Sequence, residues 1–223
     1  MLFHPSLRRA PLFVGLCLLF VFAAGGAARA DSVISAFGSA VDALQDYTVT
    51  IADHEISGGR TQDRVVRYWY KRPNAAKIEV VSGAGRGGVA VWRGGDTLRG
   101  HQGGFLSMIK LTVGLHDPRA TSLRGDTIDS ASFAYELEHF KTTKGELAEA
   151  PGPRIEGVST DTLTLNVADP SGNGGVSKDV LYISRDTHLP VKRERYQGET
   201  LVKSELFGNL KTNINLIDRD FAL

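Results

Sequence analysis

Residues 62–74 read QDRVVRYWYKRPN, a run of β-branched and aromatic residues that ends in a proline turn. Such side chains favour strands, and Pro73 pushes Arg72 out of helical geometry, so we expect a strand over 62–71 with Arg72 at its end. Large side chains occupy both faces of this strand, Val65 and Trp69 on one and Val66, Tyr68 and Tyr70 on the other. A sheet that is wetted on one face normally alternates more cleanly.

The segments on either side alternate like antiparallel strands. Upstream, Tyr47, Val49 and Ile51 recur at every second position before a turn at 57–59. Downstream, glycine-rich turns separate strands that we expect over 77–82, 89–93 and 97–101. Short strands with glycine turns indicate pairing between sequence neighbours. The meander continues in the C-terminal part, over 162–168, 176–184, 190–197, 201–206 and 210–216.

Two helices and two irregular segments complete the predicted elements. Asp31-Ser32 can cap a helix whose apolar residues follow helical spacing to Leu44. A second helix begins at Asp126 or Thr127 and runs to about Phe140. Residues 103–124 are apolar but surrounded by glycines, which makes them a candidate flap over a cavity. Residues 144–156 are charged and broken by proline, as in a surface connection.

These elements predict a mainly β protein of the α+β type, with two helices. The strands number about ten, and a flat sheet of that many strands tends to curl. We therefore expect a strongly curved antiparallel sheet, or half-open barrel, with the helices filling or covering its concave face. Residues 31–223 should form it as a single domain.

The first thirty residues have the parts of a bacterial secretory signal. Arg8 and Arg9 precede an apolar run over 12–24, and Ala28-Arg29-Ala30 forms a cleavage site. We expect cleavage after Ala30 and a soluble protein in the periplasm. The chain's single cysteine, Cys17, lies in the apolar run, so the mature chain has no thiol for a disulfide.

Charge and motifs argue against several classes of function. Removing the signal leaves 23 of the 26 basic residues against 25 acidic ones, a net charge of −2 that does not suit nucleic acid. The pattern G-x-G-x-x-G at 83–88 is followed by a strand rather than the helix that a dinucleotide site needs. The histidines show no metal-ligand spacing, and no serine lies in a nucleophile elbow. We expect no metal, no cofactor and no catalysis.

Scattered acidic pairs, such as Glu136 with Glu138 and Glu194 near Glu199, are expected to lie on the solvated surface.

A curved open sheet is expected to leave a cavity on its concave face. Apolar cavities of useful size bind apolar ligands, although aromatic side chains are more often simple packing. Arg72 has two interpretations, a solvated basic turn or a rim residue whose five donors bond carbonyls and latch a flap shut. The predicted cavity and lid residues are Trp69, Arg72, Trp92, Phe105, Met108, Ile109 and Phe140.

The stretch Trp69-Tyr70-Lys71-Arg72-Pro73-Asn74 resembles the corresponding part of LolA, the periplasmic lipoprotein carrier, and residues 89–96 match the next hairpin of that family. The C-terminal runs at 189–191, 206–213 and 220–221 are similar to an uncharacterised LolA-like family of secreted bacterial proteins, the domain-of-unknown-function family 1571. Asp117-Pro118 before the second helix also fits that family.

The resemblance implies a half-open barrel with a helical lid and a cavity for acyl chains, in which Arg72 holds the lid and governs its opening. The leading hypothesis is a monomeric, non-enzymatic periplasmic carrier for a lipoprotein or free lipid, with possible donor and acceptor proteins in the envelope. The alternative is an envelope-stress sensor or assembly module that binds a protein partner with the same half barrel. A hydrolase is a distant third hypothesis.

Overall fold

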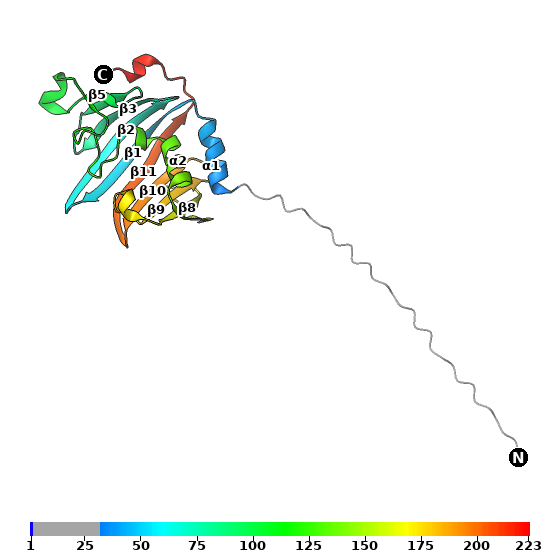
Figure 1. Ribbon diagram of the computed structural model, residues 1–223. Helices are drawn as coiled ribbons and strands as arrows, with labels where there is room; N and C mark the ends of the chain where they lie inside the picture. The colour runs from blue at the N-terminus through cyan, green and yellow to red at the C-terminus, as the bar shows by residue number, and fades with distance from the viewer. Residues whose placement is uncertain (2–31) are drawn as a thin grey trace. The chain divides into compact units, whose positions relative to one another are not determined.

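The computed structural model describes Met1 and residues 32–223, apart from the side chain of Leu106. The predicted signal, its cleavage site and Cys17 lie outside the described residues. Eleven antiparallel strands form one sheet, which curves around two helices (Figure 1). The strands are β1 (Asp46–Ser57), β2 (Arg60–Lys71), β3 (Ala75–Gly83), β4 (Val89–Trp92), β5 (Thr97–His101), β6 (Leu111–Gly114), β7 (Gly145–Pro151), β8 (Thr160–Val167), β9 (Lys178–Ser184), β10 (Pro190–Gln197) and β11 (Thr200–Thr212).

The order of the strands leaves the sheet open. It reads β6-β5-β4-β3-β2-β1-β11-β10-β9-β8-β7, so each half is a meander and the long strands β1 and β11 join the halves at the centre. β6 and β7 are opposite edges and do not pair. The predicted mainly β fold with a strongly curved, half-open antiparallel sheet is confirmed.

Helix α1 (Val33–Asp42) begins at the predicted cap, because the Ser32 side chain accepts a hydrogen bond from Ser35 N. Glu149 of β7 adds a second cap: its carboxylate accepts from Val33 N at 2.9 Å and from Ile34 N at 3.1 Å. A carboxylate at this end also complements the helix dipole. Residues 144–156 are thus not only a surface connection, because they contain β7.

Helix α2 (Phe133–Thr142) begins later than predicted. Ser132 is its cap, with a side chain that accepts from Tyr135 N, and a 3-10 turn over Asp129–Ala131 precedes it. Asp126 cannot serve as the cap because its carboxylate bonds to side chains of the sheet. The described helices α1 and α2 have ten residues each, and no described helix is long and apolar enough to cross a bilayer.

β11 replaces the last two predicted strands. Gly208 and Asn209 suggested a break, but Asn209 has φ 53° and the register with β1 shifts at this level, as in a β-bulge. The chain leaves the sheet after Thr212, and its last residues pack on the outer face. There Leu216 and Phe221 cover Val91 and Trp69.

The main core lies between the concave face and the helices. Its centre is Tyr47 of β1, whose ring stacks on Phe133 of α2 with centroids 4.7 Å apart and planes at 7°. The Tyr47 hydroxyl also accepts a hydrogen bond from Phe133 N at 3.0 Å. Both side chains are buried, so this pair fixes the start of α2 against the sheet.

Replacing Phe133 with alanine should therefore destabilise the protein strongly. We expect the free energy of unfolding to fall by about 3–5 kcal/mol, as for other fully buried aromatic residues. Tyr135→Ala, in the same helix turn but 47% exposed, is the matched control and should cost less than about 1 kcal/mol. Urea titrations followed by circular dichroism measure both. Equal losses would contradict the assignment of Phe133 to the core.

Candidate functional site

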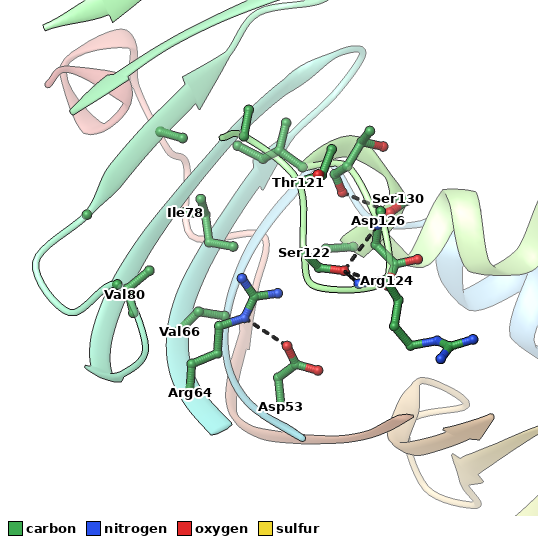
Figure 2. Close-up of a pocket in the computed structure, with 18 of the residues that line it drawn as sticks. Asp53, Arg64, Val66, Ile78, Val80, Thr121, Ser122, Arg124, Asp126 and Ser130 are labelled. Carbon is green, nitrogen blue, oxygen red and sulfur yellow. Dashed lines mark hydrogen bonds and ion pairs between the residues drawn. The ribbon is translucent and has the colours of Figure 1, made fainter. Parts of the chain in front are cut away.

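The concave face contains a cavity of about 940 Å³. Strands β1 to β6, β10 and β11 line it from the sheet, and the connection from β6 to α2 lines it from the other side (Figure 2). This connection crosses the concave face because β6 and β7 are opposite edges of the sheet. The volume is typical of ligand pockets, which span roughly 300–1,000 Å³.

The wall on the side of β2 to β6 is aliphatic. Residues of one face follow each other at every second position, and Ile78 pairs in register with Ala90 of the next strand. Of the described phenylalanine, tyrosine and tryptophan residues, only Tyr135 is part of the lining. The apolar lining residues are Ile51, Val66, Ile78, Val80, Ala84, Val89, Ala90, Leu98, Leu111, Val113, Ala120, Ile128, Ala131 and Val176.

The opposite end of the cavity is ionic. Its charged lining residues come from four strands and from the connection. They are Asp53, Arg64, Arg124, Asp126, Arg193, Arg195, Lys203 and Glu205. The cavity therefore joins an aliphatic wall to a dense group of charges.

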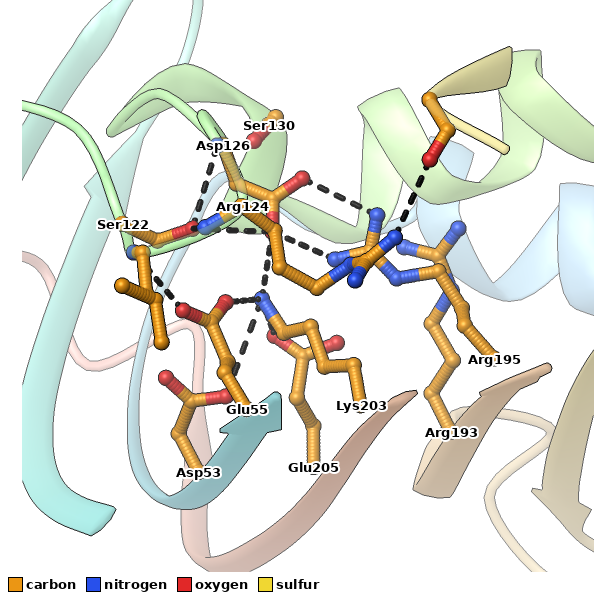
Figure 3. Close-up of polar contacts among 12 residues, drawn as sticks. Asp53, Glu55, Ser122, Arg124, Asp126, Ser130, Arg193, Arg195, Lys203 and Glu205 are labelled. Atoms are coloured by element: carbon orange, nitrogen blue, oxygen red, sulfur yellow. Dashed lines mark hydrogen bonds and ion pairs between the residues drawn. The ribbon is translucent and has the colours of Figure 1, made fainter. Parts of the chain in front are cut away.

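Lys203 lies at the centre of this ionic end (Figure 3). Its Nζ atom is 2.7 Å from Asp126 Oδ2, 2.9 Å from Glu55 Oε1 and 3.0 Å from Glu205 Oε1. Burial by itself lowers the pKa of a lysine, but the surrounding carboxylates raise the pKa of Lys203 above its usual value. Lys203 thus carries a buried positive charge that these acidic groups neutralise.

Asp126 ties the connection to the sheet. Its carboxylate accepts from both terminal nitrogens of Arg195, at 3.0 Å for Nη1, and from Lys203 Nζ. Arg124 donates from Nη1 to the carbonyl of Ile56 at 2.6 Å. These bonds hold the connection over the cavity.

Arg193 links α2 to the sheet in the same way. Its guanidinium makes two hydrogen bonds to the Asp179 carboxylate, one of 2.9 Å from Nε, and contacts Glu136 of α2. His139, one turn further along α2, lies 3.0 Å from Asp179. The side chains of Arg193, Asp179 and Glu136 are all buried.

The two carboxylates that share Arg193 differ in proton affinity. Burial opposes ionisation of both, but Arg193 and His139 hold the pKa of Asp179 below its usual range. Glu136 has fewer compensating contacts, and its Oε2 has no hydrogen-bond partner among the described residues. Burial therefore raises the pKa of Glu136 to about 8, and likewise that of Asp53 to about 6.

The charged cluster has a sequence signal that the prediction missed. The charges continue the period-two alternation of the apolar residues on the concave face. Along β1 this face carries Tyr47, Val49, Ile51, Asp53 and Glu55, all of them buried. Along β11 it carries Lys203, Glu205 and Phe207.

The predicted solvation of two acidic residues was wrong. Glu136 is 2% exposed because it faces Arg193, whereas its neighbour Glu138 is exposed as expected. Glu194 is also buried, on β10, where its carboxylate accepts from the hydroxyls of Tyr182 and Tyr196.

The seven predicted cavity and lid residues are dispersed, and none of them lines the cavity. Trp69 is on the outer face, where Arg67 and Lys77 approach its ring at 5.6 Å and 5.4 Å. Phe140 is buried beneath α2, and Trp92 packs at the border of the main core. A ligand contact by these three side chains stays a prediction.

The candidate flap is only partly a cover. Phe105, Met108 and Ile109 are 99%, 90% and 53% exposed, so their side chains do not close over the cavity. A 3-10 helix over Gly104–Met108 leads into β6, which extends the edge of the sheet. The later residues of the segment, from Arg119 onward, do border the cavity.

Arg72 holds the C-terminal end of α1. It donates from Nε to the carbonyl of Leu44 at 2.7 Å and from Nη2 to that of Val41 at 2.8 Å. Carbonyls at a helix C-terminus lack partners within the helix, so a guanidinium is well suited to them. The side chain makes these bonds rather than extending freely into solvent.

Several described histidines contact nearby polar groups. His139 lies between Asp179 and Thr143, and the Thr143 Oγ1 atom is 3.1 Å from His139 Nδ1. Thr143 itself does not line the cavity. Within residues 32–223, no group of three or more His, Cys, Asp or Glu side chains is arranged to hold a metal ion. The carboxylates around Lys203 already surround its ammonium group.

Comparison with known proteins shows the fold. No known family model matches the sequence, and no curated protein is detectably similar to it. Among solved structures, lipoprotein LppX of Mycobacterium tuberculosis matches with a TM-score of 0.51 and 17% identity, over 83% of this chain and 96% of LppX. MucB matches with a TM-score of 0.50 and 15% identity, over 86% of this chain and 61% of MucB.

A LolA superfamily protein from Nitrosomonas europaea matches at 13% identity and a TM-score of 0.40, over 86% of this chain and 98% of its own. The chain shares its fold with LppX and MucB. The predicted likeness to LolA-like proteins is confirmed at the level of the fold, whereas no comparison shows the likeness to family 1571.

Glu136 should make the stability of this fold depend on pH. Its ordinary pKa is 4.5, so between about pH 4.5 and 8 the folded state keeps a proton that the unfolded state loses. The free energy of unfolding should therefore fall as the pH rises through this range. The slope attributable to one such group is up to about 1.4 kcal/mol per pH unit.

Glu136→Gln, which cannot ionise, should remove this slope. We expect urea titrations at pH 5 and pH 7.5 to show a smaller loss of stability for this variant than for the wild type. Glu138→Gln, at an exposed position of the same helix, should follow the wild type. Parallel curves for all three proteins would show that Glu136 is ionised in the folded state.

Proposed function

We propose that this protein is a non-enzymatic periplasmic carrier that binds an acyl chain of a lipid or lipoprotein in the cavity of its concave face. The observation that carries the proposal is the aliphatic wall of that cavity. Elsewhere on the concave face, aromatic rings under the helices fill the space, as Tyr47 and Phe133 do. Along β2 to β6 smaller aliphatic side chains border an open volume instead.

An apolar chain is the ligand that gains most from this wall. Burial of apolar surface contributes roughly 25 cal/mol per Å², and the wall offers few hydrogen-bond partners for a polar ligand. The ionic end supplies a place for a polar head. Arg64 extends into the cavity beside Val66 (Figure 2), with Nε donating to Asp53 at 2.8 Å. An amphiphile fits this arrangement with its chain on the wall and its head near Arg64.

The predicted export signal supports the periplasmic location and an encounter with lipid-modified proteins or free lipids. We propose that the protein acts as a monomer between donor and acceptor proteins of the envelope. The solved structures support the fold of such a carrier, and the cavity supports the class of ligand.

A large side chain in the wall should block ligand binding. Ile78→Trp places an indole in the cavity, whereas Glu79→Trp places the same group on the other face of β3, where Glu79 is 38% exposed. We expect the affinity for cis-parinaric acid, a fluorescent fatty acid, to fall at least tenfold in the first variant. The second should stay within about twofold of the wild type. Equal affinities in all three proteins would place the ligand elsewhere.

Arg72 should control how the lid opens. α1 contacts α2, and α2 together with the preceding turn borders the cavity, so loosening the end of α1 frees the cover. We expect Arg72→Leu to speed the release of bound cis-parinaric acid by about a hundredfold, or roughly 2.7 kcal/mol, measured by stopped-flow fluorescence. Its free energy of unfolding should fall by only about 1 kcal/mol, because the Arg72 side chain is 38% exposed and a hydrogen bond contributes about that much net stability.

Arg67→Leu is the control for this variant, because Arg67 is on the outer face of β2 and 51% exposed. It should leave release unchanged. If Arg72→Leu lowers stability and speeds release by equal free energies, Arg72 is a structural turn residue and not a latch.

A further inference from the structure

The connection between β5 and β6 exposes a group of large apolar side chains. Phe105 and Met108 are 99% and 90% exposed, and Ile109 and Leu111 are 53% and 45% exposed. We call these four residues the apolar tip. Single exposed apolar residues are ordinary, but four within seven positions concentrate exposed apolar surface in one short segment, as interaction surfaces do.

The charged side chains in the segment around the apolar tip are all positive. Residues 97–116 contain Arg99 and Lys110 but no aspartate or glutamate. Arg86 belongs to the adjacent loop, because a Cβ on Gly103 would lie 1.8 Å from the Arg86 carbonyl oxygen. Arg86, Arg99 and Lys110 are exposed, and within residues 32–223 no acidic side chain forms an ion pair with any of them. Lys110 donates to the carbonyl of Leu223 at 3.1 Å.

The apolar tip adjoins the cavity. Gly103, Gly104 and Leu111 line the cavity, so its wall continues directly into the exposed patch. The segment projects at the edge of the sheet beyond β5 (Figure 1). A surface bound there would lie next to this part of the cavity wall.

We propose that this edge docks on an anionic phospholipid surface. The apolar side chains enter the boundary between head groups and acyl chains, while Arg86 and Arg99 meet phosphate groups. Peripheral segments bind membranes by this combination of contacts. A second copy of the chain is a less suitable occupant, because the like charges of two such edges would face each other. Docking does not require that the cavity hold a ligand.

Flotation of the purified protein with vesicles tests the proposal. We expect binding to vesicles of phosphatidylglycerol and phosphatidylethanolamine, little binding to phosphatidylcholine alone, and weaker binding at high salt. Phe105→Ser with Met108→Ser should reduce binding at least tenfold, and so should Arg86→Gln with Arg99→Gln. Leu147→Ser with Ile214→Ser removes two apolar residues that are 36% and 42% exposed outside the tip and should bind like the wild type.

The results separate docking from the proposed carrier function. Ile78→Trp should still float with anionic vesicles, and the Phe105 and Met108 double variant should still bind cis-parinaric acid without vesicles. Binding that ignores lipid charge, or that survives the tip substitutions, overturns the proposal. A wild-type dimer in analytical ultracentrifugation that the tip substitutions convert to a monomer also overturns it, in favour of a second copy.

Discussion

The buried ion pairs and hydrogen bonds around Lys203 and Arg193 are the interactions on which the concave face depends. These two residues come from β11 and β10, and their partners come from β1, β9, α2 and the connection after β6. An unpaired charge at such a site costs several kcal/mol, so the partners must all be in place together. The cluster therefore holds the connection and α2 at a set height above the sheet, and this height leaves room for a cavity.

The open topology supplies the second constraint. Because the meanders end at opposite edges, the chain between β6 and β7 has to cross the concave face, and it covers only part of that face. α1 is fastened at both ends, by Glu149 of β7 and by Arg72 after β2, so it bridges the two halves of the sheet. The aliphatic wall of β2 to β6 remains uncovered and becomes the side of the cavity.

This arrangement gives the cavity an aliphatic wall and an ionic end, and it places the apolar tip beside the cavity. An amphiphile can place its chain on the aliphatic wall and its head near the charged residues. These charged side chains are largely paired with each other within the protein. The apolar tip would bring this part of the cavity close to a lipid surface. Cargo binding and docking then use separate side chains on one continuous surface.

The sequence by itself determined most of the strands and the start of α1 at Ser32, but not β6 and β7, which lie in segments predicted to be a flap and a surface connection. Alternation, caps and proline turns depend on neighbours a few residues away, so a local pattern reveals them. Only the tertiary structure decided which side chains face the cavity. Trp69 stands one position from Tyr68 yet lies on the other face, and Glu136 looks solvated because its partner Arg193 is 57 residues away. Register and the path of the connection set these environments, and both arise from segments distant in the chain.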